Sequence, residues 1–559
     1  MTDFVAWNPT SHPTVLLNDD VQLKHHGLEK TASYIARKNG AYYEVIKGGT
    51  SSGAGTIAFG GSESVGAAGT DPTAVLQAAL TALDGVYGKL FIKNGSYVVD
   101  PLGIPDYTTV EGEDREKTIL KLTPGYIFVA NTETHVLRGN RHGTITPNHD
   151  ITIRNLTCDV DGTNQTLGVG EEVGFGGVCL LWAYHSHIEN VHVKNALRQG
   201  IGIWSIAVGS PGTYQTESTI LNNFVESCGE GLTHDAAIFV SANHSIRNIV
   251  TGNVCWNNDG SGIEFEDYGA RSVIANNICG SNSRHGFYIV NSDLLSITGN
   301  VSEDNTLNGF NIADSGQITV NGNVSYDNTE HGISVNGTSN SVILQGNAIT
   351  ENGLDGIQIY TSGGGGYGFT ITGNDTNFNG NNGIIAVGNG VNYCNITGNS
   401  VFYNDQTSSG DHGIYINNST HNLINSNISK GDDQGYGIYE VGTSDYNTII
   451  GNNCIGNATL GVFVTGANTR VHSNIGYVTE NSGTGTIATG GPPATSGNVA
   501  HGCDYTPALE HISIVLTENP TNTPGLVWVD SVDATNIVVK CENDPGASNL
   551  DFSWAVRRL

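Results

Sequence analysis

The chain has few charged residues, few cations and a single methionine. Its 559 residues include 23 Lys and Arg against 53 Asp and Glu, which gives a formal net charge of −30, although only 14% of the residues are charged. Nucleic acids and anionic membranes need a cationic face, so this balance excludes both as the main partner. No apolar run approaches the roughly 18 residues that cross a bilayer, so no membrane-spanning segment is predicted.

The chain also lacks a metal-binding or disulfide pattern of cysteines. Its nine cysteines are odd in number and have no Cys-x-x-Cys spacing, which argues against a zinc site or a regular disulfide framework. Several occupy repeat positions described below, or adjoin them, and are predicted to be small buried thiols: Cys255, Cys279, Cys394 and Cys454. Residues 1–13 lack the basic and apolar segments of a secretory signal. We nevertheless expect an extracellular protein, either secreted with its signal removed or carried on a virus particle.

Glycine and asparagine, by contrast, are abundant and recur at intervals. The 75 glycines have no Gly-X-Y period, so the chain is not collagen-like. An asparagine before a small or apolar residue recurs every 23 to 28 residues, at Asn253, Asn277, Asn300, Asn323, Asn347, Asn374, Asn399, Asn427 and Asn453. About ten residues after each, a polar residue precedes a glycine and an alternating apolar run, as in His285-Gly286-Phe287.

This repeat predicts the fold. Alternation in short runs indicates strands, and the glycines and asparagines between them indicate turns. A period in the low to mid twenties without helical patterning is typical of one coil of a parallel β-helix. Leucine-rich repeats would show leucines at fixed offsets, and helical repeats would show a 3.6-residue period. Stacked asparagines about 4.8 Å apart could hydrogen-bond along the coils. The predicted class is all-β.

Three regions are expected along the chain. Residues 1–64 form a Gly-rich leader with some strands, and residues 65–477 form the β-helix. A helix over residues 73–83 closes the N-terminal end of the β-helix, because an open coil end exposes core and unpaired backbone. Residues 478–559 form a small C-terminal β-sandwich, with strands near 511–516, 526–529, 536–540 and 551–556.

This order resembles the pectate-lyase-like right-handed parallel β-helix superfamily over roughly residues 65–475. Its members include polysaccharide lyases, glycoside hydrolases, uronan epimerases and phage tailspikes. Three groups of this sequence are Glu266-Asp267-Tyr268, Asn276-Asn277 and Arg284-His285-Gly286-Phe287. They resemble a stretch of the secreted mannuronan C5-epimerases, in which Ala-Asp-Tyr, Asn-Asn and Arg-His-Gly-Phe occur at the same separations. Tailspike-like proteins are the second resemblance.

The epimerase resemblance implies that Asp267 and Arg284 belong to a catalytic groove. That family also carries a Tyr-Gly-x-Asp-Pro-His motif one coil earlier, which has no match in this sequence. In the corresponding coil His234 and Asp235 stand at a different spacing.

Aligning the Gly-apolar strands predicts one outer groove that gathers polar residues from consecutive coils. The candidate catalytic residues are His234, Asp235, Glu266, Asp267, Tyr268, Arg284 and His285. The candidate substrate-binding residues are Glu264, Tyr288, Asn311, His331, Gln358 and Tyr360. Strand alternation places Glu264 and Glu266 on the same face, about 7 Å apart. His285 and His331 share one repeat position with Asn308 and Asp355, so a ladder of polar turn residues also explains them.

Two chemistries suit these residue types. Proton abstraction at C5 of a uronate needs a base such as His or Tyr, a cation such as Arg284 to hold the sugar carboxylate, and an acid. Reprotonation at C5 gives a C5-epimerase, and loss of the glycosidic oxygen gives a lyase. Paired carboxylates about 5–9 Å apart would instead hydrolyse a glycosidic bond, as in a tailspike-like hydrolase. A non-catalytic adhesin or tail fibre that binds glycan is the third alternative.

The expected partner is therefore a polysaccharide, and the sequence requires no cofactor. Asp159 and Asp161 could help to bind Ca²⁺, which prefers clustered oxygen ligands. Cys158-Asp159-Val160-Asp161-Gly162 resembles an Asp-Gly turn of the epimerases. The protein is expected to be a monomer, or a homotrimer through residues 480–559 by analogy with tailspikes.

Overall fold

The computed structural model describes residues 72–85, 87–126, 134–140, 148–165, 175–181, 183–205, 216–229, 235–242, 247–267, 270–361, 366–388, 391–518, 520–546 and 549–557. It also gives the paths of six earlier strands, β1 (Phe4–Trp7), β2 (Thr14–Leu17), β3 (Val21–Lys24), β4 (Ser33–Arg37), β5 (Ile46–Gly48) and β6 (Gly55–Phe59). The chain divides into two compact units, Met1–Val342 and Ile343–Leu559.

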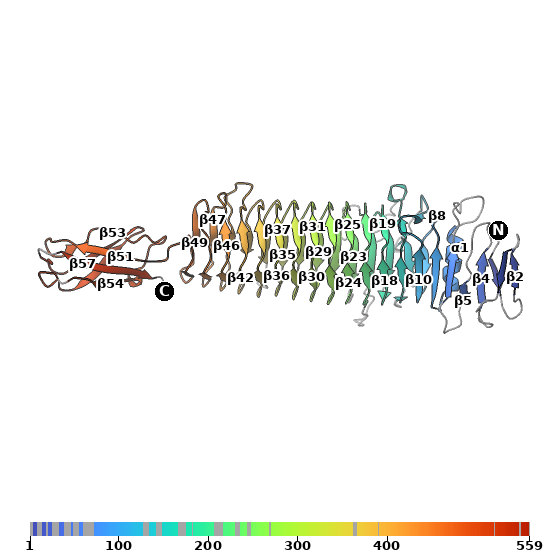
Figure 1. The fold of residues 1–559 in the computed structure, drawn as a ribbon, viewed down its shortest axis with the longest axis horizontal. Coiled ribbons are helices and arrows are strands. Elements are labelled where there is room, and N and C mark those ends of the chain that lie inside the picture. The colour runs from blue at the N-terminus through green and yellow to red at the C-terminus, as the bar shows by residue number, and fades with distance from the viewer. Residues whose placement is uncertain are drawn as a thin grey trace. The chain divides into compact units, whose positions relative to one another are not determined.

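In the first unit, the sequence repeat forms coils of three short strands (Figure 1). One coil contains β24 (Ile249–Thr251), β25 (Val254–Trp256) and β26 (Ser261–Glu266), and the next contains β27 (Val273–Ala275), β28 (Ile278–Gly280) and β29 (Phe287–Val290). Each strand pairs in parallel with its equivalent in the next coil. The predicted all-β parallel β-helix is confirmed.

The coils build three parallel sheets in this unit. The first sheet also contains β7 (Gly88–Ile92), β10 (Thr108–Gly112), β14 (Thr152–Arg154), β18 (His187–Glu189), β21 (Thr219–Leu221), β30 (Ser296–Thr298) and β33 (Thr319–Asn321). The second also contains β8 (Gly95–Val99), β11 (Thr118–Leu122), β15 (Thr157–Asp159), β19 (His192–Lys194), β22 (Phe224–Glu226), β31 (Val301–Glu303) and β34 (Val324–Tyr326). The third also contains β9 (Leu102–Ile104), β12 (Thr134–Gly139), β16 (Phe175–Leu181), β20 (Ile201–Ser205), β23 (Ala236–Ala242), β32 (Phe310–Ala313) and β35 (Ile333–Gly337).

A column of buried asparagines links neighbouring coils. The Nδ2 group of Asn277 donates to Asn300 Oδ1 at 2.9 Å and to the carbonyl of Val250 at 2.9 Å. Its Oδ1 accepts from the backbone N–H of Asn253 at 3.0 Å. Each amide therefore bridges three coils, and the bonds satisfy polar groups that would otherwise be costly to bury. A second column repeats this arrangement at Asn258, Asn282, Asn305 and Asn328.

Helix α1 (Pro72–Ala82) packs at the start of the third sheet of the first unit. Its Leu76, Ala79 and Leu80 are buried. Gln77 accepts a hydrogen bond from the backbone N–H of Gly103 at 2.8 Å and donates to the carbonyl of Gly103 at 3.1 Å. Gly103 lies in β9, the edge strand of the sheet, so the helix satisfies backbone groups that an open edge would leave exposed.

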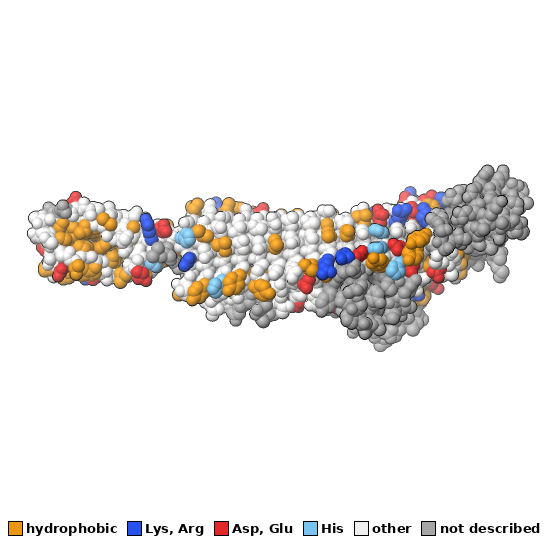
Figure 2. Space-filling model, turned by 90° about the horizontal axis from the view of Figure 1, so that it is seen from below, with side chains coloured by type: hydrophobic (Ala, Val, Ile, Leu, Met, Phe, Trp, Pro, Cys, Tyr) orange, Lys and Arg blue, Asp and Glu red, His pale blue; other side chains and the backbone are white. Residues whose placement is uncertain are grey.

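The second unit is also built from coils of three short strands. Its first sheet contains β36 (Ile343–Gln345), β39 (Thr370–Thr372), β42 (Asn395–Thr397), β45 (Leu423–Asn425), β48 (Thr448–Ile450) and β50 (Arg470–His472). Its second contains β37 (Ala348–Thr350), β40 (Asp375–Asn377), β43 (Ser400–Phe402) and β46 (Ile428–Lys430), and its third contains β38 (Ile357–Thr361), β41 (Ile384–Val387), β44 (Ile414–Asn417), β47 (Tyr436–Val441) and β49 (Leu460–Val464). On the face seen in Figure 2, charged side chains are sparse over the middle coils.

One repeat position differs from the sequence assignment. The asparagine column of the second unit runs through Asn374, Asn399, Asn427 and Asn452, with Asn427 Nδ2 donating to Asn452 Oδ1 at 2.9 Å. The spacing of the repeat predicts Asn453 in this column. Asn452 and Asn453 are adjacent, so the spacing of the repeat does not distinguish them. The strand register places Asn452 in the buried column.

The C-terminal strands of the second unit form two antiparallel sheets. One contains β51 (Glu480–Ile487), β54 (Ile512–Leu516) and β57 (Leu550–Arg557), and the other contains β52 (Ala494–Thr495), β53 (Val499–Ala500), β55 (Val527–Val532) and β56 (Asn536–Cys541). Ile487, Ile537, Val539, Phe552 and Trp554 share one buried core between them.

All nine cysteines are buried free thiols. Within the described residues, no helix is long and apolar enough to cross a membrane.

Candidate functional site

Two carboxylates lie on the outward side of β26. Ile263 and Phe265 are fully buried in the core of the coil, so the alternate residues Glu264 and Glu266 point away from it. Glu264 is nevertheless only 1% exposed, whereas Glu266 is half-buried. A carboxylate buried on the outward side of a sheet is costly unless charge or hydrogen bonds compensate it, which makes this strand the starting point of the candidate site.

Tyr288 occupies the equivalent outward position in the next coil. Its Cα is the register partner of Glu264 on one side and of Asn311 on the other. Burial raises the pKa of the Tyr288 phenol, and the charges of Glu264, Glu266 and Asp314 raise it further, while Arg284 lowers it. The phenol therefore remains protonated at neutral pH and is suited to act as a proton donor.

His285 packs beside this phenol. The His285 and Tyr288 ring centroids are 5.1 Å apart, and His285 is 6% exposed. Burial, together with the charge of Arg284, lowers the pKa of His285 to about 3. The backbone N–H of Asn308 lies 3.2 Å from Nδ1 and can only donate, so the proton of the neutral ring resides on Nε2. Nε2 in turn lies 3.3 Å from Asn311 Nδ2; both nitrogens then carry N–H groups, so this is a packing contact and not a hydrogen bond.

The predicted repeat position of His285 and His331 is present as a ladder. Asn308 lies between them, and its Oδ1 accepts the backbone N–H of His331 at 3.0 Å. The backbone N–H groups of Gly286 and Gly309 continue the column to the carbonyls of Asn308 and His331. Hydrogen bonding along the coils thus accounts for polar residues at this position, and this ladder links His331 to the candidate site.

Asp267 lies at a turn that repeats from coil to coil. Its φ is +48°, and the equivalent residues Asn291 and Asp314 have φ values of +48° and +49°. Asp and Asn tolerate this left-handed conformation better than most residues. The Asp267 carboxylate accepts a hydrogen bond from Asn291 Nδ2 at 3.3 Å. Its geometry therefore supports a turn role, alongside the groove role that the epimerase resemblance implies.

Asp235 forms a buried ion pair with Arg198. Arg198 Nη1 lies 3.1 Å from Asp235 Oδ1, and the two side chains are 5% and 1% exposed. Sequence reasoning selected Asp235 but missed Arg198. The available signal was position, because Arg198 stands two residues before Gly200, as Arg284 stands two residues before Gly286. The pair places a compensated charge beside the third sheet, two coils before His285.

The remaining predicted residues are His234, Tyr268, Gln358 and Tyr360. His234 and Tyr268 lie outside the described residues. Gln358 and Tyr360 belong to β38 of the second unit, where Tyr360 is 50% exposed.

The two predicted calcium ligands are each paired with lysine. Asp161 Oδ1 lies 3.1 Å from Lys121 Nζ, and Asp159 Oδ2 lies 3.8 Å from Lys194 Nζ. Asp159 Oδ1 also accepts the Asp161 backbone N–H and Asn195 Nδ2. A calcium ion would therefore have to displace these lysines. In the described part of the chain, no cluster of three or more His, Cys, Asp or Glu side chains is arranged to hold a metal ion.

These features define a parallel β-helix protein with a polar cluster on the outward face of its third sheet. A family model described as "Right handed beta helix region" matches residues 213–375, in agreement with the predicted hand of the coils. No curated protein matches the sequence.

Solved structures of similar fold include two epimerases and a tailspike. The A-module of the Azotobacter vinelandii mannuronan C-5 epimerase AlgE6 is 17% identical, with 73% of this chain and 95% of that chain covered and a TM-score of 0.44. The Dettilon tailspike protein is 14% identical, with 89% and 92% covered and a TM-score of 0.40. The periplasmic alginate epimerase AlgG is 14% identical, with 76% and 84% covered and a TM-score of 0.37.

Proposed function

We propose that this protein is an extracellular enzyme that modifies a uronate-containing polysaccharide by proton transfer at C5 of the sugar. The observation that supports this proposal is the position of Tyr288: a protonated phenol that is the register partner of the buried carboxylate Glu264 and that also lies in the field of the Arg284 cation. A base, an acid and a cation are the groups that C5 chemistry of a uronate requires.

In the proposed reaction, Arg284 pairs with the carboxylate of the sugar and so favours the negative charge that develops when C5 loses its proton. Glu264 accepts that proton, and Tyr288 donates its own. Donation to C5 from the opposite face inverts the centre and gives an epimerase. Donation to the departing glycosidic oxygen leaves a C4–C5 double bond and gives a lyase.

His285 is assigned a positioning role in this scheme. With a pKa of about 3 and its Nδ1 engaged by a backbone N–H, it is a weak base. Its ring instead packs against Tyr288 and the Asn311 side chain, two residues whose backbones are in register.

Hydrolysis of a glycosidic bond is the second candidate, because Glu264 and Glu266 share one side of one strand. Alternate residues of a strand are about 7 Å apart. That spacing falls in the range of roughly 6.5–9.5 Å found for inverting glycoside hydrolases, with room for one water molecule between the carboxyl groups.

One experiment separates these functions. The protein is incubated with mannuronan, polygalacturonate and neutral polysaccharides while unsaturation is followed by ultraviolet absorbance and C5 configuration by proton NMR. Unsaturated ends identify a lyase, and altered C5 configuration without cleavage identifies an epimerase. New reducing ends without unsaturation identify a hydrolase and contradict C5 chemistry. No reaction with any polymer contradicts an enzymatic role and favours a glycan-binding adhesin.

Matched variants test the assigned residues. We expect Arg284→Ala and Glu264→Gln each to lower turnover by about 10²-fold or more, the usual effect of removing a charge-stabilising group or a general base. Arg271→Ala removes an exposed arginine of the same unit, and Glu303→Gln changes a carboxylate on the second sheet, so both should retain full activity. Full activity of Arg284→Ala would contradict uronate recognition at this cluster.

A further inference from the structure

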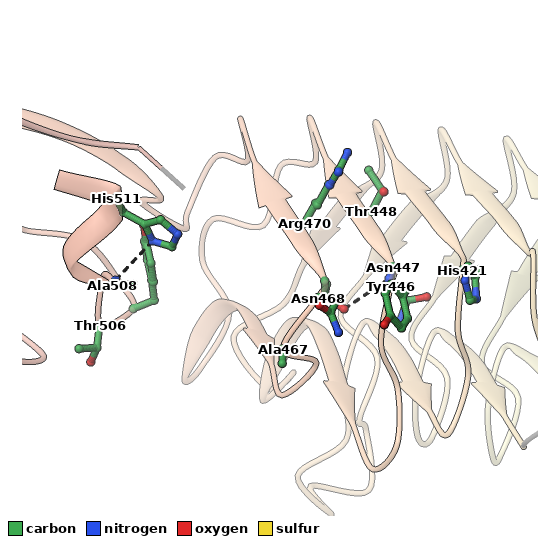
Figure 3. A pocket seen from close by; sticks show the side chains of 12 residues that line it. His421, Tyr446, Asn447, Thr448, Ala467, Asn468, Arg470, Thr506, Ala508 and His511 are labelled. Atoms are coloured by element: carbon green, nitrogen blue, oxygen red, sulfur yellow. Dashed lines mark hydrogen bonds between the residues drawn. The ribbon is translucent and has the colours of Figure 1, made fainter. Parts of the chain in front are cut away.

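A cleft in the second unit is lined by basic and neutral side chains. It has a volume of about 650 Å³ and is lined by residues at or just before the starts of β45, β48 and β50, and by Tyr505, Thr506, Ala508 and His511 (Figure 3). Arg470, His421 and His511 contribute to its lining, and none of the described residues that line it is Asp or Glu. In a chain with 53 acidic and 23 basic residues, such a lining favours an anionic ligand by charge complementarity.

A row of exposed aromatic side chains leads into this cleft. Tyr393, His421 and Tyr446 occupy the same position in three successive coils, two residues before β42, β45 and β48. The Tyr393 and His421 ring centroids are 5.1 Å apart, and those of His421 and Tyr446 are 5.2 Å apart with an 11° angle between the rings. Tyr393 is 64% exposed and Tyr446 is 55% exposed.

Polar groups at the end of this row are held in position. The Asp445 carboxylate accepts the Asn468 backbone N–H at 2.7 Å and Asn468 Nδ2 at 2.7 Å. It also accepts the backbone N–H of Tyr446 at 2.9 Å. These bonds hold the Asp445 carboxylate against the Asn468 turn and fix the Asn468 amide at the wall of the cleft.

We propose that the row of Tyr393, His421 and Tyr446, together with the cleft around Arg470, is a binding site for an acidic polysaccharide. The Arg470 guanidinium pairs with a carboxylate or sulfate of the sugar, and the exposed rings contact its apolar C–H surface. Asn468 and Thr448 supply hydrogen bonds to sugar hydroxyls. This site lies in the second unit, whereas the proposed reactive cluster lies in the first, so binding here does not depend on the proposed reaction.

The test is calorimetric titration of the full-length protein with oligomannuronate, a sulfated oligosaccharide and neutral maltohexaose. The Glu264→Gln background prevents turnover without altering the cleft. We expect the acidic oligosaccharides to bind, with affinity that falls as salt rises, and maltohexaose to bind at least tenfold more weakly. The stronger of the two acidic ligands identifies carboxylate or sulfate as the recognised group.

Two variants and two controls complete the test. Arg470→Ala and Tyr446→Ala should each weaken binding about tenfold or more, whereas Lys430→Ala and Tyr326→Ala, which alter second-sheet side chains, should not. Thermal unfolding establishes that each variant is folded, and the His421 ring protons should shift on titration with the acidic ligand. Wild-type affinity in both Arg470→Ala and Tyr446→Ala, equal binding of maltohexaose, or no binding of either acidic oligosaccharide would overturn the proposal.

Discussion

Arg198 and Asp235 form an ion pair in the interior of the first unit, although they are 37 residues apart in the sequence. The Asp235 backbone is also engaged, because its carbonyl accepts the N–H of Ser261 at 2.8 Å in the following coil. The pair thus joins three consecutive coils. Arg284 occupies the equivalent position in the coil that follows these three.

Removal of one partner of this pair should destabilise the first unit strongly. Asp235→Ala removes the carboxylate that faces the buried Arg198 guanidinium, and breaking a buried ion pair in this way costs about 3–5 kcal/mol. Urea unfolding followed by circular dichroism measures the loss. The double variant Arg198→Met/Asp235→Leu should recover most of the stability. A loss in Asp235→Ala below about 0.5 kcal/mol, the size of an ordinary surface change, would contradict an energetic role for the pair.

Substitution of any single asparagine in the buried column should lower the stability of the protein. Asn300→Ala removes the acceptor of the Asn277 backbone N–H and side-chain amide and the donor to the Ile274 carbonyl, all of which are buried. Unsatisfied buried groups of this kind cost about 1–3 kcal/mol each, so we expect a loss of about 3 kcal/mol or more in urea unfolding. Asn321→Ala, at an exposed position of β33, is the control and should change stability by less than about 0.5 kcal/mol.

Glu440 should make the second unit less stable as pH rises. Its side chain is fully buried in β47, and burial raises its pKa above 4.5 despite hydrogen bonds from Asn447 and Thr469. The unfolded chain therefore ionises first, and the stability present below pH 4.5 is lost as pH rises through the raised pKa. Urea unfolding at acidic and neutral pH should show a larger loss for the wild type than for Glu440→Gln. An identical pH dependence in both proteins would contradict this assignment.

His285 should stay neutral throughout the physiological pH range. With a pKa lowered to about 3, its NMR signals should not titrate between about pH 5 and 8, and the ring should show the Nε2–H tautomer. Because the unfolded chain takes up this proton near pH 6.5, the stability contribution is present above that value and is lost as pH falls toward 3. His285→Asn, which has the side chain found at Asn308, should remove this loss. A midpoint near pH 6.5 in the folded protein would contradict the burial argument.

The thiols should be inaccessible in the native protein. All nine cysteines are buried, and burial raises the pKa of Cys228, Cys394 and Cys454 to about 12. Only the thiolate reacts readily with aromatic disulfide reagents. The native protein should therefore react with such a reagent slowly at mildly alkaline pH, and urea should release nine equivalents. Rapid reaction of one thiol before unfolding would identify a locally open coil.

The fold could be predicted because its stabilising groups repeat. Asn277 and Asn300 occur once per coil at the position where the buried amide bridges coils, so spacing alone reveals the period. The outward direction of Glu264 also follows from alternation with Ile263 and Phe265. These inferences need only local periodicity, which a single sequence contains.

The ion pair of Arg198 and Asp235 and the aromatic row could not be predicted in the same way. Arg198 and Asp235 meet only because a coil of unusual length returns to the same register, and loop length hides that register in the sequence. Tyr393, His421 and Tyr446 lie at a turn away from the glycine marker, so alignment on glycine does not place them together. The burial of Glu264 could not be predicted either, because it depends on the packing against the outward face of the sheet and not on the alternation within β26.

The amide bridges have a consequence for how such a chain can change length. Each coil carries its own copy of the link to the coil before and the coil after, so no contact depends on the total number of coils. Duplication of residues 277–299 in frame would place a new asparagine at the same 23-residue interval as Asn277 and Asn300. A gene encoding such a protein can therefore gain or lose whole coils. Insertion or deletion of coils changes the position of a functional surface along the β-helix while its neighbouring strands stay the same.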